Sequence, residues 1–325
     1  MSSPLVSILI PVFNRQDHIA ECIQSALDQT YRPIEIIVVD NASTDQTWEI
    51  IQNLASEHAQ LSVFRNPENV GPVRNWKRCI EMADGPLAKF LFSDDLLYPN
   101  YLTATVPLLT DNVGFVFTGG IIGQTPGHGS LSYVWPNVPT ITSGRRFVLE
   151  YGYGPMSTPL PVSPVAGLFR TADLHANLRT EFIHSDLTGL EAHGAGPDLL
   201  FYLLAASHYP KVAHLDKPLT FFRTHPGAIT MQQGVNRLSV YYQAATIDVL
   251  REHWPMRYLK RFLSAIWLKE MNQLGRYISF KEFVARYKLR FPVNFSLDGI
   301  VLFAVRSVKR RLVGCSIARQ MACVD

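Results

Sequence analysis

Residues 5–45 read LVSILIPVFNRQDHIAECIQSALDQTYRPIEIIVVDNASTD, and this stretch decides the fold. Two apolar runs, residues 6–12 and 34–39, have the length and β-branched content of buried strands. Between them, apolar side chains recur at the spacing of one helical face: Ile19, Cys22, Ile23, Ala26 and Leu27. A strand, a helix and a second buried strand in close succession form a βαβ unit, which predicts a parallel sheet.

The alternation of strand and helix continues through the first hundred residues. Residues 61–64 and 87–92 have strand character, and an apolar stripe over residues 76–83 indicates a helix between them. Residues 43–46, Ser-Thr-Asp-Gln, resemble a capping box, in which the serine side chain would begin the helix that follows the second strand. We therefore predict an α/β fold with a mostly parallel sheet.

Two of the predicted strands end in acidic residues, namely Asp40 and the pair Asp94-Asp95. Open α/β sheets bind ligands beyond the carboxyl ends of their strands. Residues 11–15 lack the glycines of a dinucleotide site, and the sequence contains no G-x-x-x-x-G-K-[ST] phosphate loop. If this half binds a nucleotide, the adjacent carboxylates of Asp94 and Asp95 could hold its phosphates through a divalent cation. The alternative is that these two aspartates cap the N-terminus of the helix that follows.

The pattern is less regular from residue 113 onward. Apolar segments are interrupted by glycines at 119, 120, 123, 127 and 129 and by prolines between 155 and 164. Residues 198–207 and 238–250 have helical spacing. The chain carries a net charge of only +3, yet residues 256–325 contain 14 Lys/Arg and 4 Asp/Glu. A basic end of this kind fits nucleic acid, anionic lipid or a solvated helix face.

Composition and termini indicate a cytoplasmic protein. The four cysteines, Cys22, Cys79, Cys315 and Cys323, are far apart in the sequence, so we expect reduced thiols rather than a zinc site. The N-terminus lacks the basic segment of a secretory signal, and Pro11 breaks its apolar run. No apolar run approaches the roughly 18 residues of a membrane span.

Three segments resemble the start of glycosyltransferase family 2: residues 7–14 (SILIPVFN), 25–31 (SALDQTY) and 35–45 (EIIVVDNASTD). The resemblance continues to about residue 110 through Asn69, Gly71, Arg74, Asn75 and Ser93-Asp94-Asp95, and it is weaker around residues 196–230. It implies a GT-A fold, which is a Rossmann-like, mostly parallel sheet with helices on both faces. It also implies a nucleotide-sugar donor, Mg²⁺ or Mn²⁺, and inversion at the anomeric carbon.

The resemblance also implies which residues bind the donor. Pro11 and Asn14 would lie beside the nucleotide, and Asp40 would accept a hydrogen bond from the nucleobase or ribose. Arg74 would help to hold the nucleotide. Asp94 would contact the ribose or the shell around the metal.

The same family pattern places the metal at Asp95, whose carboxylate would ligate the cation that bridges the two phosphates. The cation would neutralise the negative charge that develops on the leaving oxygen. His225, in a late Arg-x-His element, would complete the metal site, although a lone histidine is often structural. The sequence departs from the family at Phe92, where an aspartate is common, so we expect few protein ligands to the metal.

The catalytic base is expected in residues 194–200, GAGPDLL, which resemble the acidic segment of the family. The usual Glu-Asp pair is here Pro197-Asp198, so Asp198 is the candidate base. An inverting transfer needs one carboxylate to remove the acceptor hydroxyl proton. A helix N-cap is the alternative role for Asp198, and Glu191 is the second candidate base.

These observations divide the chain into three parts: residues 1–112 as the donor-binding half, 113–235 as the acceptor and catalytic-base half of the same domain, and 236–325 as a helical, basic extension. The processive synthases of the family that the sequence resembles carry a Gln-x-x-Arg-Trp element and membrane helices, and this sequence has neither. The resemblance therefore implies a non-processive hexosyltransferase of polysaccharide biosynthesis. The expected donor is a UDP-sugar and the expected acceptor a glycan or lipid-linked sugar, without nucleic acid as a partner. A non-catalytic nucleotide-sugar or carbohydrate-binding protein on the same fold, and a nucleotidyltransferase, are the alternatives.

Aromatic and basic residues alternate in the extension, which suits peripheral contact with an anionic membrane at the inner face of the cell membrane. The aromatic members are Trp267, Phe280, Phe283, Phe291, Phe295 and Phe303. The basic members are Lys260, Arg261, Arg286, Lys288, Arg290, Arg306, Lys309, Arg310 and Arg311. The alternative is that these aromatic rings pack against the rest of the protein while the charges are solvated.

Overall fold

The computed structural model of the protein describes residues 3–151, 160–228 and 235–297. The strands within these ranges are β1 (Val6–Val12), β2 (Ile34–Asp40), β3 (Leu61–Arg65), β4 (Leu87–Phe90), β5 (Leu96–Leu97), β6 (Val113–Gly123), β7 (Ser130–Ser132), β8 (Ile141–Ser143), β9 (Gly167–Arg170) and β10 (Lys211–Arg223). The α-helices are α1 (Ile19–Leu27), α2 (Thr47–Glu57), α3 (Pro72–Glu81), α4 (Tyr101–Thr105), α5 (Gly144–Tyr151), α6 (Thr171–Asn177), α7 (Pro197–His208), α9 (Val235–His253), α10 (Met256–Leu274) and α11 (Phe280–Ala285). Short 3₁₀ turns are η1 (Val106–Leu108), η3 (Pro164–Ala166) and η4 (Leu190–Ala192).

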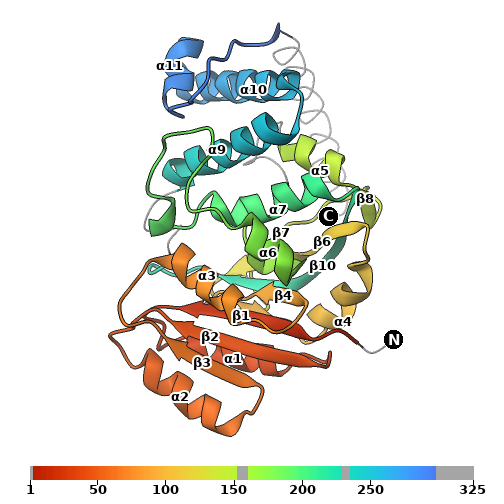
Figure 1. Ribbon diagram of the computed structural model, residues 1–325, viewed down its shortest axis with the longest axis vertical. Coiled ribbons are helices and arrows are strands. Elements are labelled where there is room, and N and C mark those ends of the chain that lie inside the picture. Colours follow the sequence, from red (N-terminus) through yellow and green to blue (C-terminus); the bar gives the residue numbers. More distant parts are fainter. Residues whose placement is uncertain (1–2, 152–159, 229–234, 298–325) are drawn as a thin grey trace, which may run out of the picture.

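One sheet runs through the molecule in the order β3-β2-β1-β4-β9-β6-β10-β5, with β7 paired to β6 and β8 to β10 (Figure 1). Strands β1 to β4 are mutually parallel, as the βαβ pattern predicts. Strand β9 is antiparallel to both of its neighbours, β4 and β6, and so joins the two halves of the sheet. The predicted α/β fold with a mostly parallel sheet is confirmed.

Helices cover both faces of the sheet, because side chains of a strand point alternately to opposite sides. In β1, Val6, Ile8 and Ile10 pack in a core with helix α1, whereas Leu9 packs in a second core that includes Trp76 of α3. Figure 1 shows α1 and α2 on one side of β1–β3 and α3, α6 and α7 on the other.

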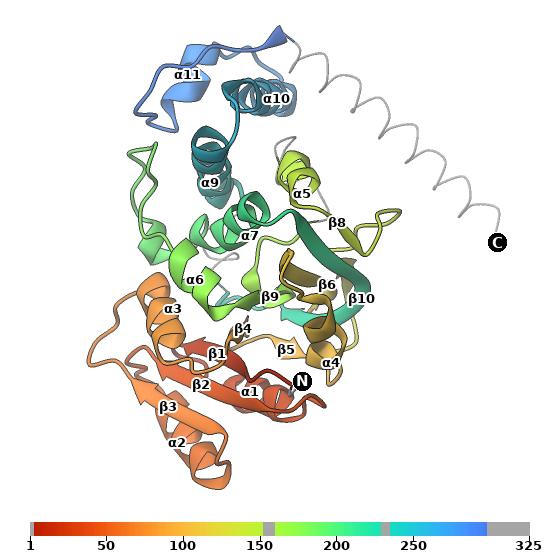
Figure 2. The same ribbon diagram turned by 45° about the vertical axis from the view of Figure 1, so that its right-hand side comes forward.

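The helices of the C-terminal extension continue this second core. Helices α7, α9 and α10 are stacked in successive layers (Figure 2), and buried residues of all three belong to one apolar cluster. The predicted helices at 198–207 and 238–250 are confirmed as parts of α7 and α9. The boundaries at residues 112 and 235 stay predictions.

Most of the described aromatic residues of the extension pack against other rings, although Phe295 is 50% exposed, and this packing favours the structural alternative for these rings. The ring of Trp267 contacts Phe280 and Phe295 at centroid distances of 5.4 and 6.2 Å, and Phe283 is fully buried against Tyr287. Phe303 and the basic residues from 306 onward lie outside the described residues. Any membrane contact would therefore depend on charge more than on these rings.

The glycines of β6 do not interrupt the strand, contrary to the sequence-based expectation. β6 is an unbroken strand that includes residues 119, 120 and 123, because the glycines let neighbouring chain segments approach closely. A Cβ at Gly120 would lie 2.4 Å from the ring of Phe222, and a Cβ at Gly123 would lie 2.0 Å from the carbonyl oxygen of His128.

The expected capping box at residues 43–46 is also wrong. Helix α2 begins at Thr47, whose backbone N–H donates to the carboxylate of Asp45 at 3.0 Å. The Ser43 hydroxyl donates instead to Asp40. A buried carboxylate competes better for this donor than a helix end does, because an unpaired buried charge is costly.

Two further expectations concern the cysteines and the membrane. Cys22 and Cys79 are buried free thiols, and burial raises the pKa of both, so they stay protonated. Cys315 and Cys323 lie outside the described residues. Within the described ranges, every helix is too short or too polar to span a bilayer.

Candidate active site

The predicted donor residues meet at the carboxyl edge of the parallel strands. Strands β1, β2 and β4 are adjacent and parallel, so the segments that follow them lie side by side. These segments contain Asn14, Asp40 and the Asp94-Asp95 pair, while Pro11 is buried within β1. The sheet thus assembles four of the predicted donor and metal positions at one edge.

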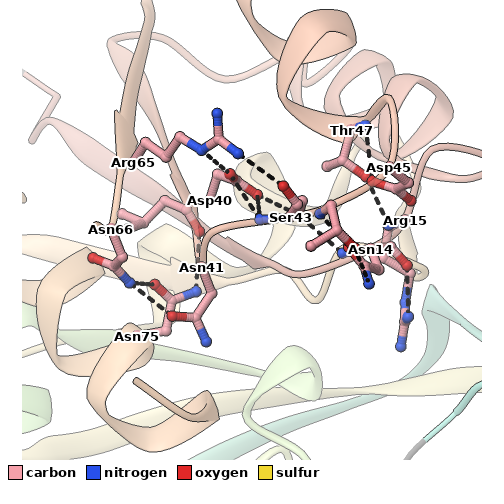
Figure 3. Close-up of polar contacts among 12 residues, drawn as sticks. Asn14, Arg15, Asp40, Asn41, Ser43, Asp45, Thr47, Arg65, Asn66 and Asn75 are labelled. Carbon is pink, nitrogen blue, oxygen red and sulfur yellow. Dashed lines mark hydrogen bonds and ion pairs between the residues drawn. The ribbon is translucent and has the colours of Figure 1, made fainter. Parts of the chain in front are cut away.

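Asp40 is fully buried and its carboxylate has protein partners on both oxygens (Figure 3). It accepts hydrogen bonds from the backbone N–H of Ser43 at 3.2 and 3.3 Å and from the Ser43 hydroxyl, and Arg65 Nε lies 3.1 Å from Oδ2. The guanidinium of Arg65 also donates to the Ser43 carbonyl. Asp40 therefore holds Ser43 and Arg65 in place, and direct donor contact by Asp40 stays a prediction.

Asn14 ties the loop after β1 to the loop after β2. Its backbone N–H donates to Ser43 Oγ at 2.9 Å, and its side-chain oxygen accepts from the backbone N–H of Thr44 at 2.9 Å (Figure 3). The backbone of Asn14 has a φ of 49°, which asparagine tolerates better than most residues. The donor-binding role of Asn14 stays a prediction, and its position beside Ser43 is compatible with it.

Hydrogen bonds among buried asparagines hold the loop at the same edge in place. Asn66 donates through Nδ2 to Asn41 and to Asn75, and Asn75 donates to the carbonyl of Val39 at the end of β2 (Figure 3). Because buried amides are costly unless they are paired, this network keeps the loop after β2 in one conformation.

Asp94 contacts two basic side chains, and Asp95 contacts a backbone N–H group. His225 Nε2 lies 2.8 Å from Asp94 Oδ2, and Arg15 Nε lies 3.6 Å from the same oxygen. The backbone N–H of Arg223, at the end of β10, donates to Asp95 Oδ1 at 3.0 Å. Burial, followed by repulsion from Asp94, raises the pKa of the Asp95 carboxyl well above its ordinary value.

These residues fit a divalent cation that is held in part by its substrate. Among the described residues, no three His, Cys, Asp or Glu side chains form a preformed metal cluster. Mg²⁺ and similar cations are often bound by one or two carboxylates together with substrate phosphates and water, so such a cluster is not required. Asp95 and His225 would hold the cation, because a positive charge relieves the unfavourable burial of the Asp95 carboxylate.

The position where the family often has a third aspartate is occupied by a packed aromatic ring. Phe92 stacks on Trp76 at a centroid distance of 5.3 Å and an interplanar angle of 23°. The side chain at this position is thus part of the packing between α3 and the sheet.

Asp198 lies in the first turn of α7 and is 7% exposed. Its Oδ1 accepts from the backbone N–H groups of Gly196 and Leu199, at 2.9 and 2.7 Å, and Oδ2 accepts from the Tyr242 hydroxyl at 3.1 Å. Burial raises the pKa of the Asp198 carboxyl to about 7, against the lowering effect of these hydrogen bonds. Oδ1 therefore binds two N–H groups at the start of the helix and Oδ2 binds a phenol, and the role of Asp198 as the base stays a prediction.

Arg74 and Glu191 form an ion pair with each other. Arg74 Nε is 3.1 Å from Glu191 Oε1, and both side chains are substantially exposed. The pair joins helix α3 to the turn η4. The nucleotide role of Arg74 and the second-candidate role of Glu191 stay predictions.

Tyr133 packs beside the end of β10. Its ring lies edge-on to Phe222, the neighbour of Arg223 on β10, at a centroid distance of 5.2 Å. Burial, followed by the charges of Asp95 and Asp198, raises the pKa of its hydroxyl.

Several residues of this region are not among the site residues that the sequence predicts: Arg15, Ser43, Arg65, Tyr133, Arg223 and Tyr242. Arg223 belongs to the Arg-x-His element and could have been selected there. Tyr133 and Tyr242 have no local signal, because each reaches the site only through the packing of segments that are distant in sequence.

Comparison with known proteins agrees with the resemblance in the sequence. The family model described as glycosyl transferase family 2 matches residues 7–172, just over half of the chain. The chain belongs to glycosyltransferase family 2. The match contains the whole edge formed by β1, β2 and β4, whereas Asp198 and His225 lie beyond it.

Two curated relatives of the family are similar over the N-terminal part. An uncharacterized glycosyltransferase of Haemophilus influenzae is 35% identical over 112 residues, which is 34% of this chain and 45% of the relative. A GalNAc(5)-diNAcBac-PP-undecaprenol beta-1,3-glucosyltransferase of Campylobacter jejuni is 31% identical over 130 residues, 40% of this chain and 41% of the relative. The matched part thus spans less than half the length of either relative.

Solved structures extend the similarity of the fold over most of the chain. S. aureus TarS in complex with UDP-GlcNAc has a TM-score of 0.63 at 18% identity, covering 82% of this chain and 72% of that one. The mannosyltransferase PcManGT from Pyrobaculum calidifontis, in complex with GDP-Man and Mn²⁺, has a TM-score of 0.51 at 15% identity, covering 94% and 80%. At these identities the likeness shows the GT-A fold alone.

The raised pKa of Asp198 predicts how stability depends on pH. Its carboxyl has an ordinary pKa of 3.8 and a folded-state pKa of about 7, so the folded protein favours the protonated acid. The stabilisation of the folded protein by protonated Asp198 is complete below pH 3.8 and is lost as the pH rises through about 7. Relative to Asp198→Asn, which does not titrate, the unfolding free energy of the wild type should fall by up to about 4 kcal/mol between pH 4 and pH 8.

Urea denaturation of both proteins across this pH range measures the difference, in which all other titrating groups cancel. A difference that is constant with pH would show that the Asp198 carboxyl has an ordinary pKa in the folded protein.

Proposed function

We propose that the protein is an inverting glycosyltransferase that transfers a sugar from a nucleotide diphosphate, a UDP-sugar, to a glycan or lipid-linked acceptor. The observation that supports this most is the state of Asp198, a carboxyl group in the first turn of α7 whose pKa burial raises to about 7. A general base works best when its pKa lies near the working pH. A protein that only binds carbohydrate has no need of such a base.

The reaction is a single displacement. The acceptor hydroxyl gives its proton to Asp198 Oδ2 while its oxygen forms a bond to the anomeric carbon of the donor. The bond from that carbon to the diphosphate breaks on the opposite face, which inverts the configuration, and the nucleoside diphosphate leaves with the bonding electrons. Tyr242 keeps Asp198 Oδ2 oriented through its hydrogen bond of 3.1 Å.

The edge of the sheet would bind the donor. When bound, a divalent Mg²⁺ or Mn²⁺ ion neutralises charge on the diphosphate leaving group, and Asp95 and His225 are the residues that would hold it. Arg15 lies 3.6 Å from Asp94 and adds positive charge at the same edge. Pro11, Asn14 and Arg74 are proposed to contact the nucleotide. TarS and PcManGT, which share the fold, are solved with UDP-GlcNAc and with GDP-Man and Mn²⁺.

The enzyme is proposed to add one hexose per encounter and to act in polysaccharide assembly. The Campylobacter jejuni relative is described as acting on an undecaprenol-linked glycan, which supports a lipid-linked acceptor. A basic C-terminal segment would then hold the enzyme at an anionic membrane surface, since each basic side chain near such lipid contributes about 1 kcal/mol.

The first prediction concerns the metal. A thermal-shift screen with UDP-, GDP-, TDP- and CMP-sugars should find a donor that stabilises the wild type only with Mn²⁺ or Mg²⁺, by about 2.7 kcal/mol at a hundredfold excess over Kd. Asp95→Asn keeps an oxygen for the Arg223 N–H but loses the charge, so the metal-dependent stabilisation by the donor should disappear. Asp111→Asn, at an exposed carboxylate, is the control. Unchanged metal dependence in Asp95→Asn would place the cation elsewhere.

The second prediction concerns the base. Asp198→Asn should bind the donor as the wild type does and lose turnover, because the base acts on the acceptor proton. In the wild type, kcat/KM should fall about tenfold per pH unit below pH 7, as Asp198 becomes protonated. Tyr242→Phe removes a hydrogen bond that lowers the pKa of Asp198, so its acid limb should move to higher pH.

Tyr258→Phe is the matched control for the pH profile, since Tyr258 contacts Arg145 at the surface. If Asp198→Asn transfers sugar near the wild-type rate, Asp198 is only a helix cap and Glu191 becomes the candidate base. If neither the wild type nor Asp198→Asn turns over any donor that it binds, the non-catalytic binding function is favoured.

The third prediction concerns the membrane. The full-length protein should sediment with anionic vesicles at low salt and be released at high salt. Replacing Lys309, Arg310 and Arg311 with glutamine should reduce this binding. The same number of replacements at Lys77, Lys211 and Lys217, which lie on the sheet domain, is the control for net charge. Equal binding by both variants, or no binding at low salt, would rule out the basic tail as the membrane contact.

A further inference from the structure

The side chain of Arg223, at the end of β10, connects the acidic edge of the sheet to helix α1. Its Nε donates to the backbone carbonyl of Asp94 at 3.0 Å, and its Nη2 donates to Glu21 Oε2 at 2.6 Å. The guanidinium carbon also lies 5.4 Å from the ring centroid of Phe221. Only 10% of the Arg223 side chain is exposed, so these contacts hold the guanidinium group in one orientation.

Arg223 binds both aspartates of the edge, through different groups. Its backbone N–H donates to Asp95 Oδ1 at 3.0 Å, whereas its side chain binds the Asp94 carbonyl. Neither contact uses the Asp94 carboxylate, whose Oδ2 lies beside Arg15 and His225. One residue thus fixes the backbone of Asp94 and the side chain of Asp95.

The same arrangement brings positive charge to an edge that is proposed to bind a cation. A guanidinium group stays charged in proteins, and like charges repel more strongly where water is partly excluded. Arg15 lies 3.6 Å from Asp94, so two guanidinium groups face the two carboxylates. Without a further acid, these charges would offset much of the attraction of the carboxylates for a divalent ion.

Glu21 supplies a further acid at this edge. It lies in the first turn of α1, and its carboxylate and the guanidinium of Arg223 form a charge-assisted hydrogen bond. An acid in the first turn of a helix also interacts favourably with the helix dipole, and an exposed ion pair adds little stability. The helix dipole accounts for an acid on α1, but it does not require a contact with a largely buried arginine 202 positions away.

We propose that Glu21 is a positioning residue of the metal site. Its carboxylate holds the guanidinium of Arg223 on the Asp94 backbone and balances its charge, so that the neighbouring carboxylates keep their affinity for a divalent cation. This inference rests on the proposed function, in which that cation binds together with the donor, and the test separates the two.

Titration calorimetry with UDP, and in parallel with GDP, measures nucleotide affinity once in EDTA and once with Mn²⁺. In Glu21→Gln the amide keeps an oxygen for Arg223 but loses the charge. The gain in affinity from Mn²⁺ should therefore fall at least about fivefold. Affinity in EDTA should be unchanged or up to about threefold higher, because the phosphates are anionic and the edge has become less negative.

Two further variants distinguish the charge of Glu21 from a structural role. Glu49→Gln removes an exposed acid from the first turn of α2, so it matches both the change in net charge and the lost interaction with a helix dipole. Its affinity in EDTA and its gain from Mn²⁺ should both stay within about twofold of the wild type. Glu21→Asp keeps the charge, so its gain from Mn²⁺ should exceed that of Glu21→Gln.

Each outcome decides the question. A gain from Mn²⁺ in Glu21→Gln that equals the wild-type gain overturns the assignment while the proposed function stands. A lower Tm in EDTA, with nucleotide binding weakened equally in EDTA and in Mn²⁺, shows that Glu21 is only structural and also overturns it. Equal gains in Glu21→Asp and Glu21→Gln exclude a role for the charge. If the wild type binds neither nucleotide more tightly with Mn²⁺, the proposed metal-dependent donor site fails and this inference fails with it.

Discussion

The hydrogen bond from the backbone N–H of Arg223 to Asp95 is the contact on which the site depends. It joins the segment after β4 to the end of β10, across 128 positions of sequence. Asp95 is 6% exposed, and a carboxylate buried to that extent is unfavourable without a donor or a cation nearby. The bond fixes Asp95 at the carboxyl edge of the sheet. It also brings His225, two residues further on, within 2.8 Å of Asp94.

The protein places its acids in two different surroundings. Asp94 and Asp95 lie beside Arg15, His225 and the backbone N–H of Arg223, where a divalent ion and a diphosphate would share the charge. Asp198 is buried with no cation beside it among the contacts that the described residues make, and its pKa rises to about 7. Burial raises the pKa of both Asp95 and Asp198. Buried carboxyl groups with raised pKa values are typical of functional sites.

Sequence patterns correctly predicted elements whose periodicity is local. They failed for residues whose contact partners are distant in the sequence. The strands at β1 and β2 and the stripe of α1 follow from the spacing of apolar residues, because each spacing matches one face of one element. The glycines of β6 were misjudged because the ring that fills their space, Phe222, belongs to another strand. Ser43 was misjudged because its hydroxyl bonds the buried Asp40 carboxylate rather than the helix that follows. Both errors come from tertiary contacts that no local window contains.

By itself, the sequence determined the α/β fold, the family, and the acidic edge at Asp40 and Asp94-Asp95, because strand ends of a parallel sheet always meet at one edge. It also indicated Asp198 as a candidate base. Only the tertiary structure decided the environment of these groups: which carboxylate is fully paired and which has a pKa near 7. Burial and charge depend on neighbours from β7, β10 and α9, and the positions of those neighbours are set by packing rather than by any spacing along the chain.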